Sequence, residues 1–84
     1  MTILIRTKDE INYITDFEGM YIKEPSKDDN VYSLYIDTKN TGFYIYKNEN
    51  KEEVMKVFNY IADEIEDGYK IGNEKISIDL NTFE

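Results

Sequence analysis

A chain of 84 residues that contains no cysteine and no histidine has to hold its fold together by burying apolar side chains. Neither a disulfide nor a Cys/His metal site is available to it. A chain of this length forms one small domain, residues 1–84, and buries about 60–65% of the surface that its unfolded form exposes. The stability margin is therefore small, and the positions of the apolar residues decide the fold.

Alternation of apolar and polar residues predicts strands in the first half of the chain and again near its end. The expected strands are residues 2–7, 17–24, 31–37, 43–47 and 74–80, while residues 11–14 form either a strand or a turn. Residues 38–42 are expected to close a hairpin, with Asn40 and Gly42 available for positive φ. One face of the sheet is expected to carry a group of tyrosines: Tyr21, Tyr35, Tyr44 and Tyr46.

The second half of the chain opens with a clear helical pattern. Asn50 is a good N-cap residue, and Glu53 stands three positions later, as in a capping box. One apolar stripe follows at helical spacing, namely Val54, Val57, Phe58, Ile61 and Ile65. Gly68 stands where a left-handed C-terminal cap belongs. We therefore expect a helix from about Asn50 to Asp67.

These elements predict an α+β domain with a mainly antiparallel sheet of four or five strands and one amphipathic helix packed on one face. The helix stripe and one sheet face would form the core. Its expected members are Ile3, Ile5, Met20, Ile22, Leu34, Ile36, Phe43, Ile45, Val54, Val57, Phe58, Ile61, Ile65, Ile76 and Ile78. The other face of the sheet would remain open and would carry the tyrosines.

Charge is the strongest indication of function. Eighteen acidic and ten basic side chains give a formal net charge of −8. This balance disfavours direct binding of nucleic acid, whose affinity depends on phosphate contacts, and favours a partner protein with a positive surface. With Arg6 as the only arginine, the tyrosines fit a protein interface better than a base-stacking platform. They are also ordinary residues for a half-exposed strand.

Four acids crowd the expected last turn of the helix: Asp63, Glu64, Glu66 and Asp67. The helix dipole already presents negative charge there, so each carboxylate costs about 0.3–1 kcal/mol at low salt. Selection for binding explains this placement, and so does a solvated face in which salt screens the charges. No oxygen-rich loop accompanies the acids, so we expect no metal and no other cofactor.

Catalysis is not expected. The chain lacks a cysteine nucleophile and a histidine base. The segment Asp37-Thr38-Lys39 matches the acid-x-Lys element of some nucleases, but a hairpin turn explains these residues better.

The hairpin and the helix carry a resemblance to a known family. The residues concerned are Ser33-Leu34-Tyr35-Ile36-Asp37-Thr38-Lys39-Asn40-Thr41-Gly42-Phe43-Tyr44-Ile45-Tyr46, then Asn48-Glu49-Asn50 and Val54 to Ile61. The second half of the chain, in pattern and composition, resembles small acidic phage anti-CRISPR proteins that inhibit the type II-A effector nuclease. The resemblance implies a non-enzymatic inhibitor whose carboxylates stand in for phosphates in a basic DNA-binding groove.

On this hypothesis the partner is a host CRISPR effector nuclease or another basic DNA-binding protein, met in the bacterial cytoplasm. The expected contact residues are Asp63, Glu64, Glu66, Asp67 and Glu74, with Tyr60 and Tyr69 nearby and Asp37 as a second choice. The alternative is a small dimeric interaction or immunity-type module that uses the tyrosine-rich sheet face. No apolar stretch approaches the roughly 20 residues that span a bilayer, so we expect no contact with membranes.

Overall fold

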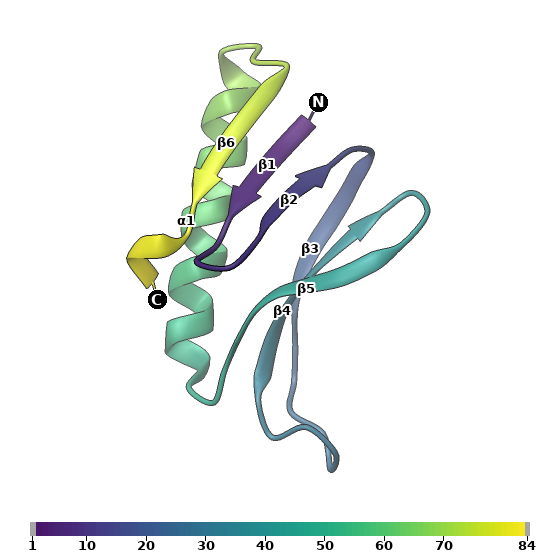
Figure 1. Ribbon diagram of the computed structural model, residues 1–84, viewed down its shortest axis with the longest axis vertical. Helices are drawn as coiled ribbons and strands as arrows, with labels where there is room; N and C mark the ends of the chain where they lie inside the picture. Colours follow the sequence, from purple (N-terminus) through teal and green to yellow (C-terminus); the bar gives the residue numbers. More distant parts are fainter. Residues whose placement is uncertain (1, 84) are drawn as a thin grey trace.

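The computed structural model describes residues 2–83, apart from the side chain of Thr82. Six strands, one α-helix and a short 3-10 helix form within these residues (Figure 1). In chain order they are β1 (Thr2–Arg6), β2 (Ile11–Ile14), β3 (Phe17–Lys23), β4 (Tyr32–Thr38), β5 (Gly42–Asn48), α1 (Lys51–Lys70), β6 (Lys75–Asp79) and η1 (Asn81–Phe83). The α+β class is confirmed.

The strands form two three-stranded sheets, so the prediction of a single sheet of four or five strands is wrong. Sheet A has the order β2-β1-β6, in which β1 pairs antiparallel with β2 and parallel with β6. Sheet B has the order β3-β4-β5 and is antiparallel throughout. The chain leaves sheet A at Asp16, whose φ of 55° turns it sharply between β2 and β3. This turn separates the two sheets.

Helix α1 begins as the sequence predicts, but it ends later. The Asn50 side chain accepts a hydrogen bond from the Glu52 N–H at 2.9 Å, as an N-cap residue should. At the other end, the N–H groups of Gly72 and Asn73 donate to the carbonyls of Tyr69 and Gly68. This is a Schellman motif with Gly72, at φ 75°, as the left-handed residue.

The prediction that Gly68 caps the helix is therefore wrong. Gly68 lies inside α1 and is buried against β6. A Cβ atom at this position would lie 2.6 Å from Cδ1 of Ile76. Gly68 thus permits close approach of helix and strand, whereas Gly72 supplies the turn.

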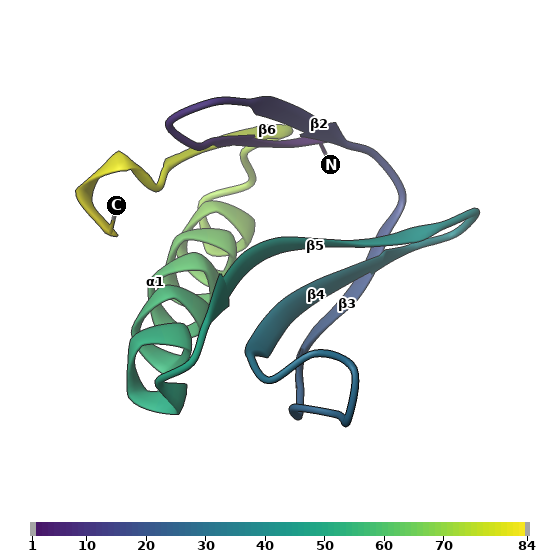
Figure 2. The same cartoon turned by 60° about the horizontal axis from the view of Figure 1, so that its bottom comes forward.

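The core lies between the two sheets and α1, which packs against both of them (Figure 2). Nine of the fifteen expected core residues are buried: Ile3, Ile5, Leu34, Ile36, Val54, Val57, Ile61, Ile76 and Ile78. The other six pack against this core while partly exposed: Met20, Ile22, Phe43, Ile45, Phe58 and Ile65. Ile14 and Leu80 are also buried. Ile14 shows that residues 11–14 belong to a strand with its own inward face.

A β-bulge in β5 changes which side chains face the core. Leu34 pairs with Tyr46, and the next residue of β4, Tyr35, pairs with Tyr44, so Ile45 has no partner in the ladder. The bulge turns Tyr46 to the inner side, where it packs against the core. The prediction that Tyr46 shares the open face with Tyr44 is therefore wrong.

The β4–β5 turn also differs from the expected one. Neither Asn40 nor Gly42 has positive φ. The Thr38 hydroxyl holds the turn instead, because it donates to the Thr41 carbonyl at 2.9 Å and accepts from the Thr41 N–H at 3.2 Å. A threonine side chain thus replaces the left-handed residues of a tighter hairpin.

Candidate interaction surfaces

The α1 acid surface, defined as Asp63, Glu64, Glu66 and Asp67, lies on the C-terminal half of the helix. Asp63, Glu66 and Asp67 are exposed, and Glu64 is partly buried. Because α1 continues to Lys70, Asp63, Glu64 and Glu66 lie before its last turn, and only Asp67 reaches the start of that turn. Lys70 stands in that turn and approaches Glu66 at 3.8 Å. The dipole penalty on the acids is therefore smaller than the sequence suggests, since the effect fades beyond the terminal turn.

The charge density of this surface is close to that of DNA. Residues 63–67 span about 6 Å of helix axis at a rise of about 1.5 Å per residue. Their four carboxylates give about one negative charge per 1.5–2 Å, compared with one per roughly 1.7 Å of duplex DNA. Lys70 compensates part of one of these charges.

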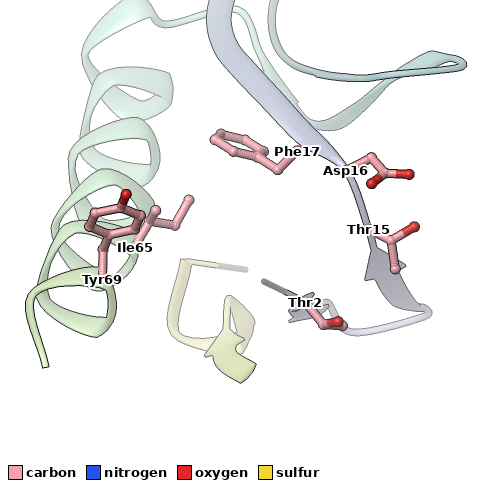
Figure 3. Close-up of a pocket in the computed structure, with 6 residues that line it drawn as sticks. All are labelled: Thr2, Thr15, Asp16, Phe17, Ile65 and Tyr69. Carbon is pink, nitrogen blue, oxygen red and sulfur yellow. The ribbon is translucent and has the colours of Figure 1, made fainter. Parts of the chain in front are cut away.

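Apolar groups adjoin the α1 acid surface. Tyr69 and Ile71 are each 74% exposed, and Glu74 lies exposed just beyond the end of the helix. A cleft of about 480 Å³ opens between this part of α1 and the connection from β2 to β3. Phe17 points across it toward Ile65 and Tyr69 of the helix (Figure 3). Sequence reasoning missed the cleft, because its two walls are far apart along the chain.

Two predicted contact residues lie apart from the α1 acid surface. Tyr60 is partly buried, and its ring packs against Phe83 with 5.3 Å between ring centroids. Asp37 lies in β4, on the face of sheet B that points away from α1. The other predicted contact residues, Asp63, Glu64, Glu66, Asp67 and Tyr69, lie on the C-terminal half of α1, and Glu74 lies in the connection from α1 to β6.

A second surface is the face of sheet B that points away from α1, here called the tyrosine face. Strand pairing arranges its side chains in three rows across β3, β4 and β5. These rows are Lys23–Ser33–Lys47, then Tyr21–Tyr35–Tyr44, then Gly19–Asp37–Gly42. The tyrosine rings follow one another at centroid distances of 5.4 and 6.3 Å. Sequence alternation indicated the tyrosines, but the bulges at Glu18 and Ile45 concealed the rows.

Contacts on the tyrosine face shift two pKa values. The Lys47 ammonium lies 3.8 Å from the centroid of the Tyr44 ring and 3.4 Å from a carboxylate oxygen of Asp29. Hydrogen bonding to Tyr44 raises the pKa of Lys47, and the charge of Asp29 adds to the effect. Burial raises the pKa of the Tyr21 phenol, with a further contribution from Asp37. The protonation of Lys47 and Tyr21 on this face therefore depends on neighbouring tyrosine and aspartate side chains.

Within residues 2–83, no group of three or more acidic side chains converges in a way that could hold a metal ion. Asp63, Glu66 and Asp67 share one face of α1, but their side chains do not converge on a common point. No helix in the described part of the chain combines the length and apolarity that crossing a bilayer requires. Comparisons with protein-family models, curated proteins and solved structures give no match for this chain.

Proposed function

We propose that this protein is a non-enzymatic inhibitor, of phage or mobile-element origin, that binds the basic DNA-binding surface of a host CRISPR nuclease. In this proposal the α1 acid surface takes the place of DNA phosphates. The observation that carries it is the presence of four carboxylates within about 6 Å of helix axis, of which only Glu66 has a lysine partner among the described residues. The choice of a CRISPR nuclease rests on the resemblance of the hairpin and helix to anti-CRISPR proteins.

In this proposal, carboxylates of the inhibitor replace DNA phosphates as the partners of basic side chains in the groove. Lysine and arginine side chains that hold phosphates can form charge-assisted hydrogen bonds with carboxylates instead. Negative charge on the inhibitor also steers the encounter and raises the association rate. Tyr69 and Ile71 add apolar contact area beside the acids. Apolar groups of this kind suit the centre of an interface, and the acids around them suit its polar rim.

A competition assay tests the proposal directly. A type II-A effector nuclease loaded with guide RNA is titrated with labelled target DNA in the presence and absence of the protein. We expect the protein to displace DNA, and to lose affinity as salt is raised. Simultaneous binding of DNA and protein to the nuclease would contradict phosphate mimicry.

Charge reversal locates the contact surface. The variant Asp63→Lys/Asp67→Lys should lose inhibition, and the new lysines favour the C-terminal half of a helix, so folding should be retained. Its matched control is Asp9→Lys/Glu18→Lys, which makes the same change in net charge at exposed positions outside α1. Equal loss of inhibition in both variants would show that total charge matters and that the α1 acid surface does not.

The tyrosine row favours a second candidate function. Tyr21 and Tyr44 are 44% and 55% exposed, and tyrosine contributes strongly to protein interfaces. On this alternative the protein is an interaction or immunity-type module that binds through the tyrosine face. Unchanged partner binding after the reversal of Asp63 and Asp67 would favour it over the first proposal.

A further inference from the structure

The charges of the tyrosine face are ordered along the strands. On one side of the tyrosine row lie Lys23 and Lys47, and on the other side lies Asp37. The β3–β4 loop brings the exposed acids Asp28 and Asp29 to the lysine end of this face, where Asp29 approaches Lys47 at 3.4 Å. At the opposite end the β4–β5 turn carries an exposed lysine at position 39. Lys23 and Asp37 therefore place opposite charges on the two sides of the tyrosine row.

Such an order is complementary to itself. If a second copy is turned by 180° about an axis that lies along the tyrosine row, its lysine row falls over the Asp37 row of the first copy. The lysine and aspartate rows each lie about 7 Å from the axis, since two residues of a strand span that distance. The tyrosine rows then meet each other, and the loop acids meet the turn lysine. A two-fold axis along the strands would instead place like charges together, which is unfavourable.

We propose that two copies of this chain associate through their tyrosine faces about a two-fold axis along the Tyr21–Tyr35–Tyr44 row. The contact is isologous, so each pairing occurs twice. It is independent of the proposed role of the α1 acid surface, because α1 and sheet A lie on the other side of sheet B (Figure 2).

The side chains around Asp37 suit this arrangement. Its neighbours across the strands are Gly19 and Gly42. The space above Gly19 is open, whereas the Tyr35 ring and the Asp37 carboxylate lean over Gly42. In the two-fold arrangement Lys23 and Lys47 of the second copy lie over these two glycines. Neither Lys23 nor Asp37 has an ion-pair partner among residues 2–83, so both are available.

The expected association is weak. Three strands of seven residues cover about 14 by 24 Å, so two copies bury on the order of 700–1,000 Å², at the low end for a specific contact. The net charge of −8 on each copy also opposes association. At physiological ionic strength the screening length is about 8 Å, so mainly the charges near the interface are felt. We therefore expect a dissociation constant of tens to hundreds of micromolar.

Sedimentation equilibrium from about 10 μM to 1 mM at physiological ionic strength tests the proposal. The wild-type protein should pass from monomer to dimer in this range. Each single reversal, Asp37→Lys or Lys23→Asp, should weaken association at least about tenfold, because like charges then meet. The double variant should recover at least about tenfold over Asp37→Lys, since the pair is restored with its signs exchanged.

Folding is checked by the melting temperature of each variant, and Asp9→Lys serves as a control that should associate like the wild type. A wild-type protein that stays monomeric at 1 mM would overturn the proposal. A dimer that tolerates both single reversals would overturn it as well, because its interface would then lie elsewhere. A failure here leaves the nuclease competition assay unaffected, so the two proposals can fail separately.

Discussion

Replacement of Gly68 by alanine should change the stability of the protein with a sign that depends on residue 76. In the wild-type background the new Cβ would lie 2.6 Å from Cδ1 and 2.7 Å from Cγ1 of Ile76. Alanine gains about 0.5–1 kcal/mol over glycine inside a helix, but overpacking a buried site costs about 1–3 kcal/mol. We expect a net loss of about 0.5–2 kcal/mol, which lowers the melting temperature by about 4–8 °C per kcal/mol.

The Ile76→Ala background removes the obstacle. That change alone should cost about 2–5 kcal/mol, because it leaves a cavity in the core. The remaining Cβ of residue 76 lies 3.9 Å from the alanine Cβ, which is an ordinary contact. In this background Gly68→Ala should therefore stabilise the protein by about 0.5–1 kcal/mol. Urea unfolding of the four proteins measures both effects. If Gly68→Ala changes the free energy of unfolding in the same direction in both backgrounds, the inference that glycine is needed at position 68 to accommodate Ile76 is refuted.

Three further predictions concern the helix ends and the tyrosine face. Asn50→Ala should lose about 0.5–2 kcal/mol in urea unfolding, whereas Asn50→Ser should keep most of the stability, because serine also caps. Gly72→Ala should cost about 1–2 kcal/mol because of its positive φ, with Gly72→Asn less harmful in the same assay. The pKa values of Tyr21 and Lys47 are raised in the folded protein. Their contribution to the free energy of unfolding is therefore complete below the ordinary pKa values of 10.0 and 10.5, and it is lost as pH rises through the raised pKa values. Melting temperatures should therefore fall in strong alkali, and less steeply in Tyr21→Phe; an unchanged slope in this variant would contradict the raised pKa.

Local patterns in the sequence predicted the elements but not their assembly. The helix start at Asn50 and the inward residues of β1, β4 and β6 follow from capping and alternation, which act over a few residues. The parallel pairing of β1 with β6 joins residues that are more than seventy positions apart. No local pattern encodes such a contact, so the division into two sheets could not be predicted.

The errors in the candidate surfaces have equally specific causes. One unpaired residue, Ile45, moved Tyr46 from the expected open face to the core side. Gly68 was predicted as the helix cap, but it packs against Ile76 inside the helix, and Gly72 with its positive φ forms the cap. The acids of α1 were identified from the sequence, because the charge of a side chain is known without any knowledge of its tertiary contacts. The separation of Asp37 from these acids could not be predicted in the same way. It depends on which face of sheet B points toward the helix, which is a tertiary property.

The place of β1 in sheet A has a consequence for biosynthesis. This strand lies between β2 and β6 (Figure 1), and β6 is made only after α1 and the whole of sheet B. Until the ribosome has released residues 75–79, one edge of β1 remains unpaired beside a nascent hydrophobic core. An unpaired strand edge can pair with another chain. We therefore expect the nascent protein to be most prone to aggregation after β1 has been synthesised and before β6 pairs with it.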